Sequence, residues 1–214
     1  MNRPRLLLAA VTTLLCAGCA TVPPKDYTAF RRSNPRSILV LPPLNESTDV
    51  AATYSVLTTL TRPLAELGYY VFPVAVVDHY LKENGLTVPG EMHRAPLAKL
   101  HEVFGADAVF YVAVEKYGTK YQIIASTTLV LLRGKLVDAR SGAVLWEGTA
   151  AADGSGGSSG SSIEGLLVRA LVDQVMSKSF DRAHVTAFSA SALLVAPPKG
   201  GLLRGPRHPA QNSQ

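Results

Sequence analysis

The sequence predicts an α/β fold in which helices pack on a β-sheet. Between residues 37 and 104, short apolar runs alternate with segments of helical period, which is the pattern of strand–helix units. Between residues 107 and 148, apolar segments follow one another with only short turns between them, which is the pattern of an antiparallel meander.

The length and composition suit one domain with extensions at both ends. The chain has 214 residues, of which 47% are hydrophobic, enough for one sizeable core. We expect a tether over residues 19–36, an α/β globular domain over residues 37–182, and a tail over residues 183–214. The tail is rich in proline, glycine and polar residues near its end, and we predict that it is disordered.

The first half of the domain is expected to contain two strands and three helices. Residues 37–41 form an apolar run closed by two prolines, which is typical of a strand buried on both faces. A polar loop follows at residues 44–49. Leucines at positions 57, 60, 64 and 67 then share one helix face, and Pro63 should kink that helix or start a new turn. Further segments are expected as a strand at 69–74, a helix at 76–84, a loop at 87–93 and a helix at 96–104.

The second half is expected to continue the sheet and to end in a helix. The strongest strand pattern is at residues 107–116, and the strand expected next is at 121–132. Gly134 is expected to allow a bend. The last segments are a short strand at 135–138, a hairpin turn at 138–142, a strand at 144–148, a flexible Gly/Ser stretch at 154–162 and an amphipathic helix at 163–179 that packs on the sheet.

The first 18 residues resemble a secretory signal peptide. Arg3 and Arg5 supply a positive head, residues 6–15 form an apolar core, and Ala17 and Gly18 are the small residues that a signal peptidase needs. The apolar run is shorter than the roughly 20 residues of a membrane-spanning helix. We therefore expect this segment to be removed.

A cysteine follows the expected cleavage site, and residues 15–19 resemble a bacterial lipobox. In a lipobox, cleavage falls before a cysteine whose sulfur carries diacylglycerol, here between Gly18 and Cys19. The resemblance implies an anchor of diacylglycerol and an N-acyl chain on Cys19, and no further cofactor. Cys16 stands where leucine is usual and lies in the removed segment. Ala20, rather than aspartate, follows the cysteine, and the sorting rule of enteric lipoproteins then implies the outer membrane, with the domain facing the periplasm.

The charge does not favour nucleic acid as a partner. The net charge of the chain is +5, and removal of the signal with Arg3 and Arg5 lowers it to +3. So mild an excess, in a secreted protein, does not suit nucleic-acid binding. Three arginines in the expected tether have two interpretations, a solvated linker or contact with anionic lipid head groups or peptidoglycan; they are Arg31, Arg32 and Arg36.

No catalytic or metal-binding constellation stands out in the sequence. The five histidines lack metal-ligand spacing, and no free cysteine would join them; they are His79, His93, His101, His184 and His208. Neither a nucleophile elbow nor a phosphate loop occurs. Asn45 and Asp107 lie at strand ends, where we interpret them as a helix-entry turn and a strand-entry residue. We expect a protein that is not an enzyme and binds no metal.

Four aromatic residues on or beside the meander strands have two interpretations. Core packing is one, and a surface for a protein partner is the other, because Tyr and Trp are enriched at interfaces; the residues are Tyr111, Tyr117, Tyr121 and Trp146. A meander also leaves an edge strand that can pair with another chain. A homo-oligomer formed through that edge is therefore a hypothesis.

Three features resemble a family of bacterial lipoproteins typified by a neisserial genome-derived antigen. They are the lipobox, the strand at 38–41 with Pro42-Pro43-Leu44-Asn45 after it, and the segments at 105–108 and 138–146. The resemblance covers residues 19–182 and extends, more distantly, to the curli-secretion lipoprotein CsgG, the N-terminal domain of TolB and LpoB, an activator of peptidoglycan synthases. It implies an α/β sandwich with a mixed sheet.

The same resemblance implies an accessory or scaffold protein of the cell envelope, acting in assembly or secretion. Its expected partners are the membrane, through the anchor, and other envelope proteins, among them a CsgG-like lipoprotein. Two alternatives stay open. One is a regulator of a peptidoglycan synthase, in the manner of LpoB, and the other is a ligand-binding protein or enzyme acting on cell-wall material.

Overall fold

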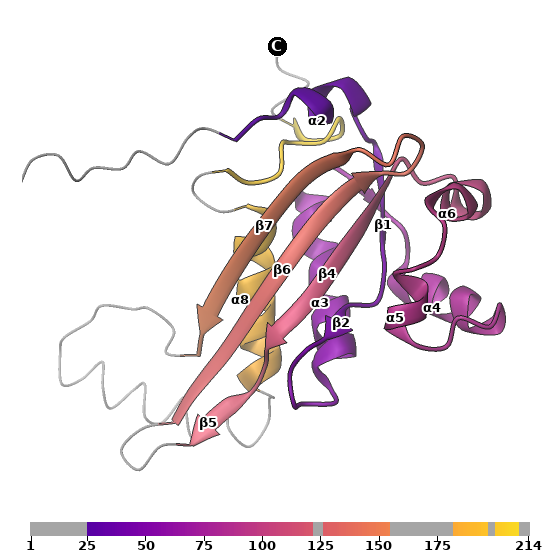
Figure 1. Cartoon of the computed structure of the whole chain (residues 1–214). Helices are drawn as coiled ribbons and strands as arrows, with labels where there is room; N and C mark the ends of the chain where they lie inside the picture. Colours follow the sequence, from indigo (N-terminus) through magenta and orange to yellow (C-terminus); the bar gives the residue numbers. More distant parts are fainter. Residues whose placement is uncertain (1–24, 122–125, 155–181, 197–199, 210–214) are drawn as a thin grey trace, which may run out of the picture.

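The computed structural model describes residues 25–121, 126–154, 182–196 and 200–209. Its centre is a seven-stranded sheet, with helices on both faces (Figure 1). The first strands pair in parallel and the later ones pair antiparallel, so the sheet is mixed. The predicted α/β fold is therefore confirmed.

The strands follow the order β3-β1-β4-β6 across the sheet, with β7 on the outer side of β6. Both β4 and β5 pair with β6, so β5 prolongs the line of β4, and β2 pairs with the second half of β4. The bounds are β1 Ser37–Val40, β2 Leu44–Asn45, β3 Tyr70–Val71, β4 Ala108–Lys116, β5 Thr119–Tyr121, β6 Ser126–Asp138 and β7 Val144–Asp153.

The helices divide between the two faces of the sheet. The bounds are α2 Thr28–Ser33, α3 Ala52–Glu66, α4 Val74–Glu83, α5 Pro89–Met92, α6 Leu97–Phe104 and α8 Arg182–Val195. The main core joins α3 and α8 to one face, and a smaller core joins α4, α5 and α6 to the other face, over β1 and the start of β4. None of the helices in the described ranges has both the length and the apolarity needed to span a bilayer.

Most of the predicted elements are present with shifted ends. The strands at 37–41 and 107–116, the helices at 76–84 and 96–104 and the turn at 138–142 correspond to β1, β4, α4, α6 and the β6–β7 hairpin. The helix expected from the leucines at positions 57, 60, 64 and 67 is α3, which continues through Pro63. The expected loops at 44–49 and 87–93 contain β2 and α5, and the strand expected at 69–74 shrinks to β3.

The predicted bend at Gly134 is wrong, because β6 runs unbroken from Ser126 to Asp138. A Cβ atom at position 134 would lie 3.0 Å from Cζ of Phe110 and 3.1 Å from Cδ2 of Leu194. Glycine at this position therefore makes room for buried side chains above the strand rather than for a turn.

The prediction of a disordered tail over residues 183–214 is wrong for the parts that the structure describes. Helix α8 packs against α3, β6 and β7 through small side chains, including Ala187, Ala190 and Ser191, all of them buried. After it, Leu202 is buried, and Tyr69 donates a hydrogen bond to the carbonyl of Leu203. The C-terminal segment is thus part of the domain.

The tether expected over residues 19–36 is also shorter than predicted. Phe30 of α2 is buried in the main core, and the Tyr27 hydroxyl donates to the carbonyl of Gly201. The folded domain therefore begins near Lys25. The signal peptide at 1–18, the lipobox cysteine and the helix expected at 163–179 lie outside the described residues, as does all of the Gly/Ser stretch except Gly154.

Candidate functional site

The candidate site is a groove on the face of the sheet that α4, α5 and α6 leave uncovered. These helices cover β1 and the start of β4, so the same face of β6 and β7 stays open (Figure 1). The groove has a volume of about 790 Å³. Its floor comes from β4, β6 and β7, and its wall comes from β2, from α6, and from the residue that follows α5, including Leu44, His93 and Leu97.

The strand register places polar side chains in rows across the groove floor. Tyr111, Lys135 and Glu147 stand opposite one another on β4, β6 and β7. The Lys135 ammonium lies 5.8 Å from the centre of the Tyr111 ring, at cation–π distance. The groove is therefore amphipathic, with an apolar floor between charged side chains.

Arg133 connects the groove floor to two carboxylates. Its guanidinium lies 3.1 Å from Glu115 and 3.3 Å from Glu46. Both acids in reach of this arginine are therefore engaged in ion pairs. Such a pairing positions charges for recognition and does not resemble the two converging carboxylates of a hydrolytic site.

His93 lies in the groove wall and is held in one tautomer. Its Nε2–H donates to the carbonyl of Pro42 at 2.9 Å, because a carbonyl can only accept, and its ring meets that of Tyr111 edge to face. Burial lowers the pKa of His93 below its ordinary value, the hydrogen bond to Pro42 raises it, and the charge of Lys135 lowers it further. The ring is therefore neutral at neutral pH.

The lowered pKa of His93 predicts a loss of stability in mild acid. The unfolded chain binds a proton near the ordinary pKa of about 6.5, whereas the folded protein binds it at lower pH. The contribution of neutral His93 to the free energy of unfolding is complete above the pKa of the unfolded chain. It is lost as the pH falls from that pKa towards the lower pKa of the folded protein. We expect the free energy of unfolding to decrease from pH 7 to pH 5, as measured by urea denaturation. The variant His93→Gln, whose amide can still donate to Pro42, should show a weaker decrease, and an unchanged pH dependence would contradict this assignment.

The outer edge of β7 borders the groove. Gly154 donates its backbone N–H inward to Thr128 of β6, so the alternation of an antiparallel ladder turns the backbone groups of Asp153, Ala151, Thr149 and Glu147 outward. The Lys25 ammonium hydrogen-bonds the carbonyl of Glu147 from that side. In the described part of the chain, no strand pairs with this edge.

The four aromatic residues that were considered as a partner surface differ in their burial. Tyr111 is half-buried and lines the groove. Trp146 and Tyr117 are buried at 2% and 7% exposure, so the interpretation as a partner surface is wrong for both, and core packing explains them. The side chain of Tyr121 lies outside what the structure describes.

A serine–histidine pair joins α3 to α8. The Ser55 hydroxyl lies 2.8 Å from Nδ1 of His184 and accepts a hydrogen bond of 2.6 Å from the hydroxyl of Tyr117. A hydrolytic triad needs a carboxylate behind the histidine, and the described residues place none there. In the same ranges, no three His, Cys, Asp or Glu side chains gather as metal ligands.

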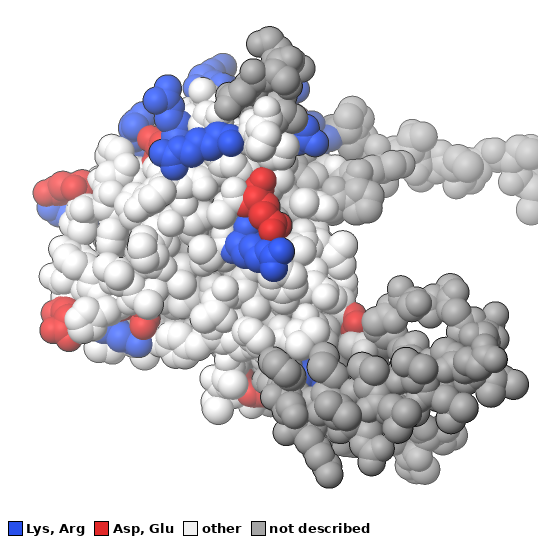
Figure 2. Space-filling model, turned by 180° about the vertical axis from the view of Figure 1, so that it is seen from behind, with Lys and Arg blue, Asp and Glu red and all other residues white. Residues whose placement is uncertain are grey.

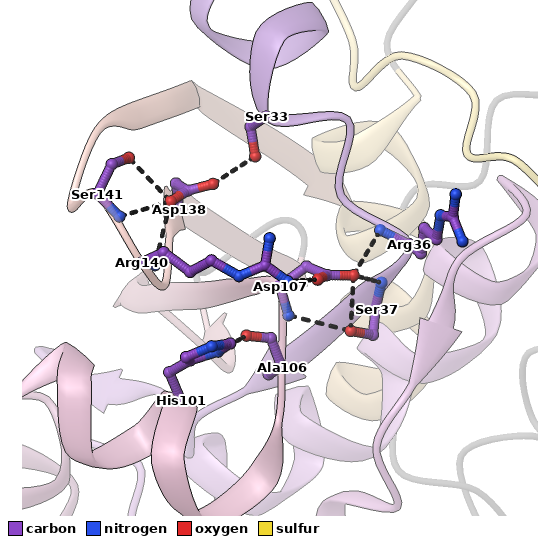
Figure 3. Close-up of polar contacts among 9 residues, drawn as sticks. All are labelled: Ser33, Arg36, Ser37, His101, Ala106, Asp107, Asp138, Arg140 and Ser141. Carbon is purple, nitrogen blue, oxygen red and sulfur yellow. Dashed lines mark hydrogen bonds and ion pairs between the residues drawn. The ribbon is translucent and has the colours of Figure 1, made fainter.

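A polar network closes the end of the sheet near α2 (Figure 3). Asp107 accepts hydrogen bonds from the N–H groups of Arg36 and Ser37 and pairs with Arg140 at 2.8 Å. Asp107 is thus a strand-entry residue, as predicted. The side-chain amide oxygen of Asn45 accepts a hydrogen bond from the N–H of Ser47, which gives the turn expected before α3.

Asp138 is the buried carboxylate of this network. It accepts hydrogen bonds from the Ser33 hydroxyl, from the Ser141 hydroxyl and N–H, and from the Arg140 N–H (Figure 3). Burial would raise the pKa of Asp138, but these hydrogen bonds outweigh it and hold the pKa below its ordinary value. The network ties α2 to the β6–β7 hairpin.

Replacing Asp138 by alanine is expected to destabilise the domain by about 3 kcal/mol, because two partly buried N–H groups and two hydroxyl groups lose a charged acceptor. Ser141→Ala removes only one hydroxyl donor and should cost about 1 kcal/mol. Urea denaturation of both variants measures the difference. Equal losses would show that the carboxylate is not the centre of the network.

The comparisons with known proteins agree with this fold. The sequence model of the GNA1162-like lipoprotein family matches residues 25–207. A Neisseria meningitidis serogroup B lipoprotein, NMB1124/NMB1162, is 45% identical over 207 residues, which are 96% of either chain. This chain belongs to the GNA1162-like lipoprotein family. It is thus a lipoprotein of the cell envelope by family.

This chain is also similar to several proteins of known structure. The crystal structure of lipoprotein GNA1162 from Neisseria meningitidis has a TM-score of 0.54 and 48% identity, and the match covers 67% of this chain and 99% of that one. A PelC dodecamer from Paraburkholderia phytofirmans has a TM-score of 0.47 at 17% identity, over 77% and 88% of the two chains. The LpoB C-terminal domain from Salmonella enterica has a TM-score of 0.39 at 17% identity, over 66% and 90%. These last two are too distant to transfer a function.

Sequence reasoning missed the groove. Arg133 and Lys135 are charged residues two apart in a segment, 129–137, that is otherwise apolar apart from Gly134, and such spacing indicates one solvent-exposed face. That spacing was the available signal. The wall residues His93 and Leu44 come from distant parts of the chain, and only the fold brings them to the strand.

Proposed function

We propose that this protein is a non-enzymatic lipoprotein, anchored by Cys19 in the outer membrane, that binds another envelope protein during assembly or secretion. The observation that supports the proposal is the open face of β6 and β7 beside an edge of β7 with which no strand of the described ranges pairs. The partner that fits such an edge is an extended segment of another protein, which adds one strand to the sheet.

Two properties of the edge favour an extended partner. The outward backbone groups of Thr149 and Ala151 lie on the side of β7 away from β6, and the side chains of these two residues are exposed. The groove next to them offers apolar floor and both signs of charge for alternate side chains of an added strand. Backbone pairing would give affinity, and the groove would give specificity. A CsgG-like lipoprotein is the partner class that the family resemblance favours.

A proline on β7 tests the proposal. Ala151→Pro removes one outward N–H and leaves the inward ladder to β6 intact, because proline is tolerated on an edge strand where its nitrogen faces solvent. Ala151→Val keeps the N–H and serves as the matched control. With a photo-crosslinking residue at Thr149 and a tag after Gln214, we expect crosslinked partners in intact cells for Ala151→Val and a loss of at least about tenfold for Ala151→Pro.

The identity of the crosslinked product separates the alternatives. Another envelope protein supports the proposal, whereas a homodimer of this chain assigns the edge to self-assembly. A peptidoglycan synthase as the partner would move the role to that of a regulator. Crosslinking that is equal in both variants, with unchanged thermal unfolding, would reject the strand edge as the contact.

A further inference from the structure

Seven cations gather at one end of the domain, which we name the basic end. They come from the start of the folded chain, from α2, from the residue before β1, from the β6–β7 hairpin and from the C-terminal segment, and all are exposed; they are Lys25, Arg31, Arg32, Arg36, Arg140, Arg204 and Arg207. Figure 2 shows Lys and Arg gathered at this end in the back view, at the height of α2 in Figure 1.

Contacts between distant segments hold the basic end together. Asp107 binds both the Arg36 N–H and the Arg140 side chain. The N–H of Tyr70 donates to the carbonyl of Arg36, and the Arg207 guanidinium lies 5.6 Å from the centre of the Tyr70 ring. The cations are therefore fixed on one surface by the fold.

The basic end is strongly unbalanced in charge. In the described ranges, four carboxylates accompany the seven cations, namely Asp26, Asp107, Asp138 and Glu147; Asp138 is buried, and the charge of Glu147 acts on Lys25. The resulting excess of three positive charges equals the +3 of the whole chain after residue 18. At the opposite end, Asp49, Lys116, Asp153 and Arg182 balance one another. The charge asymmetry thus has a direction along the strands.

The expected lipid anchor at Cys19 is attached to the chain next to the basic end. The folded chain begins at Lys25, six residues after Cys19, and six residues span about 20 Å at most. The tether predicted from the sequence, which runs from residue 19 to residue 36, would have reached about 55 Å, so the structure shortens the reach considerably. An anchor at Cys19 therefore keeps the basic end close to the membrane surface.

We infer that the basic end binds anionic phospholipid head groups and orients the domain on its membrane. The guanidinium groups supply paired donors for phosphate oxygens, and Tyr70, 44% exposed beside Arg207, is of the residue type enriched at membrane interfaces. Each cation near an anionic membrane strengthens binding about fivefold. This inference depends on the proposed anchor for its orientation, but lipid binding can be measured without the anchor.

The test uses the whole chain from residue 19 with Cys19→Ser, so that no acyl chain contributes. Vesicles of phosphatidylglycerol and phosphatidylcholine are compared with vesicles of phosphatidylcholine alone by co-sedimentation at low and high salt. We expect binding to the anionic vesicles only, weakened by salt. The triple variant Arg31→Gln, Arg32→Gln, Arg36→Gln should bind about a hundredfold more weakly.

A second triple variant controls for net charge. Arg62→Gln, Lys99→Gln, Lys116→Gln removes the same charge from α3, α6 and the end of β4, and its affinity should fall by less than about threefold. Equal losses in both variants, or no binding of the parent chain to anionic vesicles, would overturn the inference. Binding to isolated peptidoglycan without binding to vesicles would also overturn it. Thermal unfolding confirms that both variants fold, and none of these outcomes bears on lipidation at Cys19.

Discussion

Replacing Cys19 by alanine is expected to abolish lipidation of the protein completely. The chain has two cysteines, Cys16 and Cys19, and only Cys19 has the small residues Ala17 and Gly18 directly before it. Without the thiol, diacylglycerol has no atom to join, and the signal peptidase of lipoproteins has no substrate. We expect loss of palmitate label and a slower-migrating precursor on a gel.

Cys16→Ala is the matched control, because it removes the other cysteine and leaves the expected lipobox cysteine in place. It should keep the palmitate label and the mature mobility. Burial of an acyl chain contributes about 0.8 kcal/mol per CH₂, so two or three chains hold a protein on the membrane permanently. A Cys19→Ser chain exported by an ordinary cleavable signal should therefore be released into the soluble periplasmic fraction at high salt. A label that persists in Cys19→Ala would contradict the lipobox.

Strands β1 and β4 and the β6–β7 turn could be predicted because their patterns are local. The apolar runs at 37–41 and 107–116 are longer and more β-branched than their surroundings, and the turn at 138–142 combines Asp, Ser and Gly at the positions that a hairpin needs. Nothing distant is required to interpret these segments. The fold class follows from them.

Helix α8 could not be predicted in this way. Its buried face consists of small residues such as Ala187, Ala190 and Ser191, which carry little hydrophobic signal in sequence. These small side chains stabilise the domain only because α3 packs against them, where the Thr59 and Ser191 hydroxyls are 2.7 Å apart. The exposed side of α8 is also apolar, with Val185, Phe188 and Leu193, so no amphipathic period marks the helix.

The groove and the basic end escaped prediction for a related reason. Each combines residues that are far apart in sequence, as with His93 beside Tyr111 and Arg207 beside Tyr70. The composition shows only that the net charge of the chain is small, and it does not show where the charges lie. The fold concentrates that charge at one end, and no spacing along the chain shows this.

Replacing Gly148 by alanine is expected to destabilise the domain by about 3 kcal/mol, a large part of the stability of a typical domain. A Cβ atom at position 148 would overlap Cζ2 and Cη2 of Trp146, at distances that real Cβ atoms essentially never show. The ring cannot swing away easily, because it is 2% exposed and its Nε1–H donates to the carbonyl of Gly200 at 2.9 Å.

The packing around Gly134 and Gly148 explains why the Trp146 ring cannot move away from a Cβ atom at position 148. The two glycines stand opposite each other on β6 and β7, and the rings of Phe110 and Trp146 lie over them with centres 6.2 Å apart. Shifting Trp146 therefore presses on Phe110, which is itself fully buried. The control is Gly90→Ala, since a Cβ atom there meets nothing within 4 Å. Urea denaturation should separate the two variants by more than about 2 kcal/mol, and the loss at Gly148 should shrink in a Trp146→Leu background, where the indole is absent. Equal stability of the two alanine variants would show that Trp146 does not pack on Gly148.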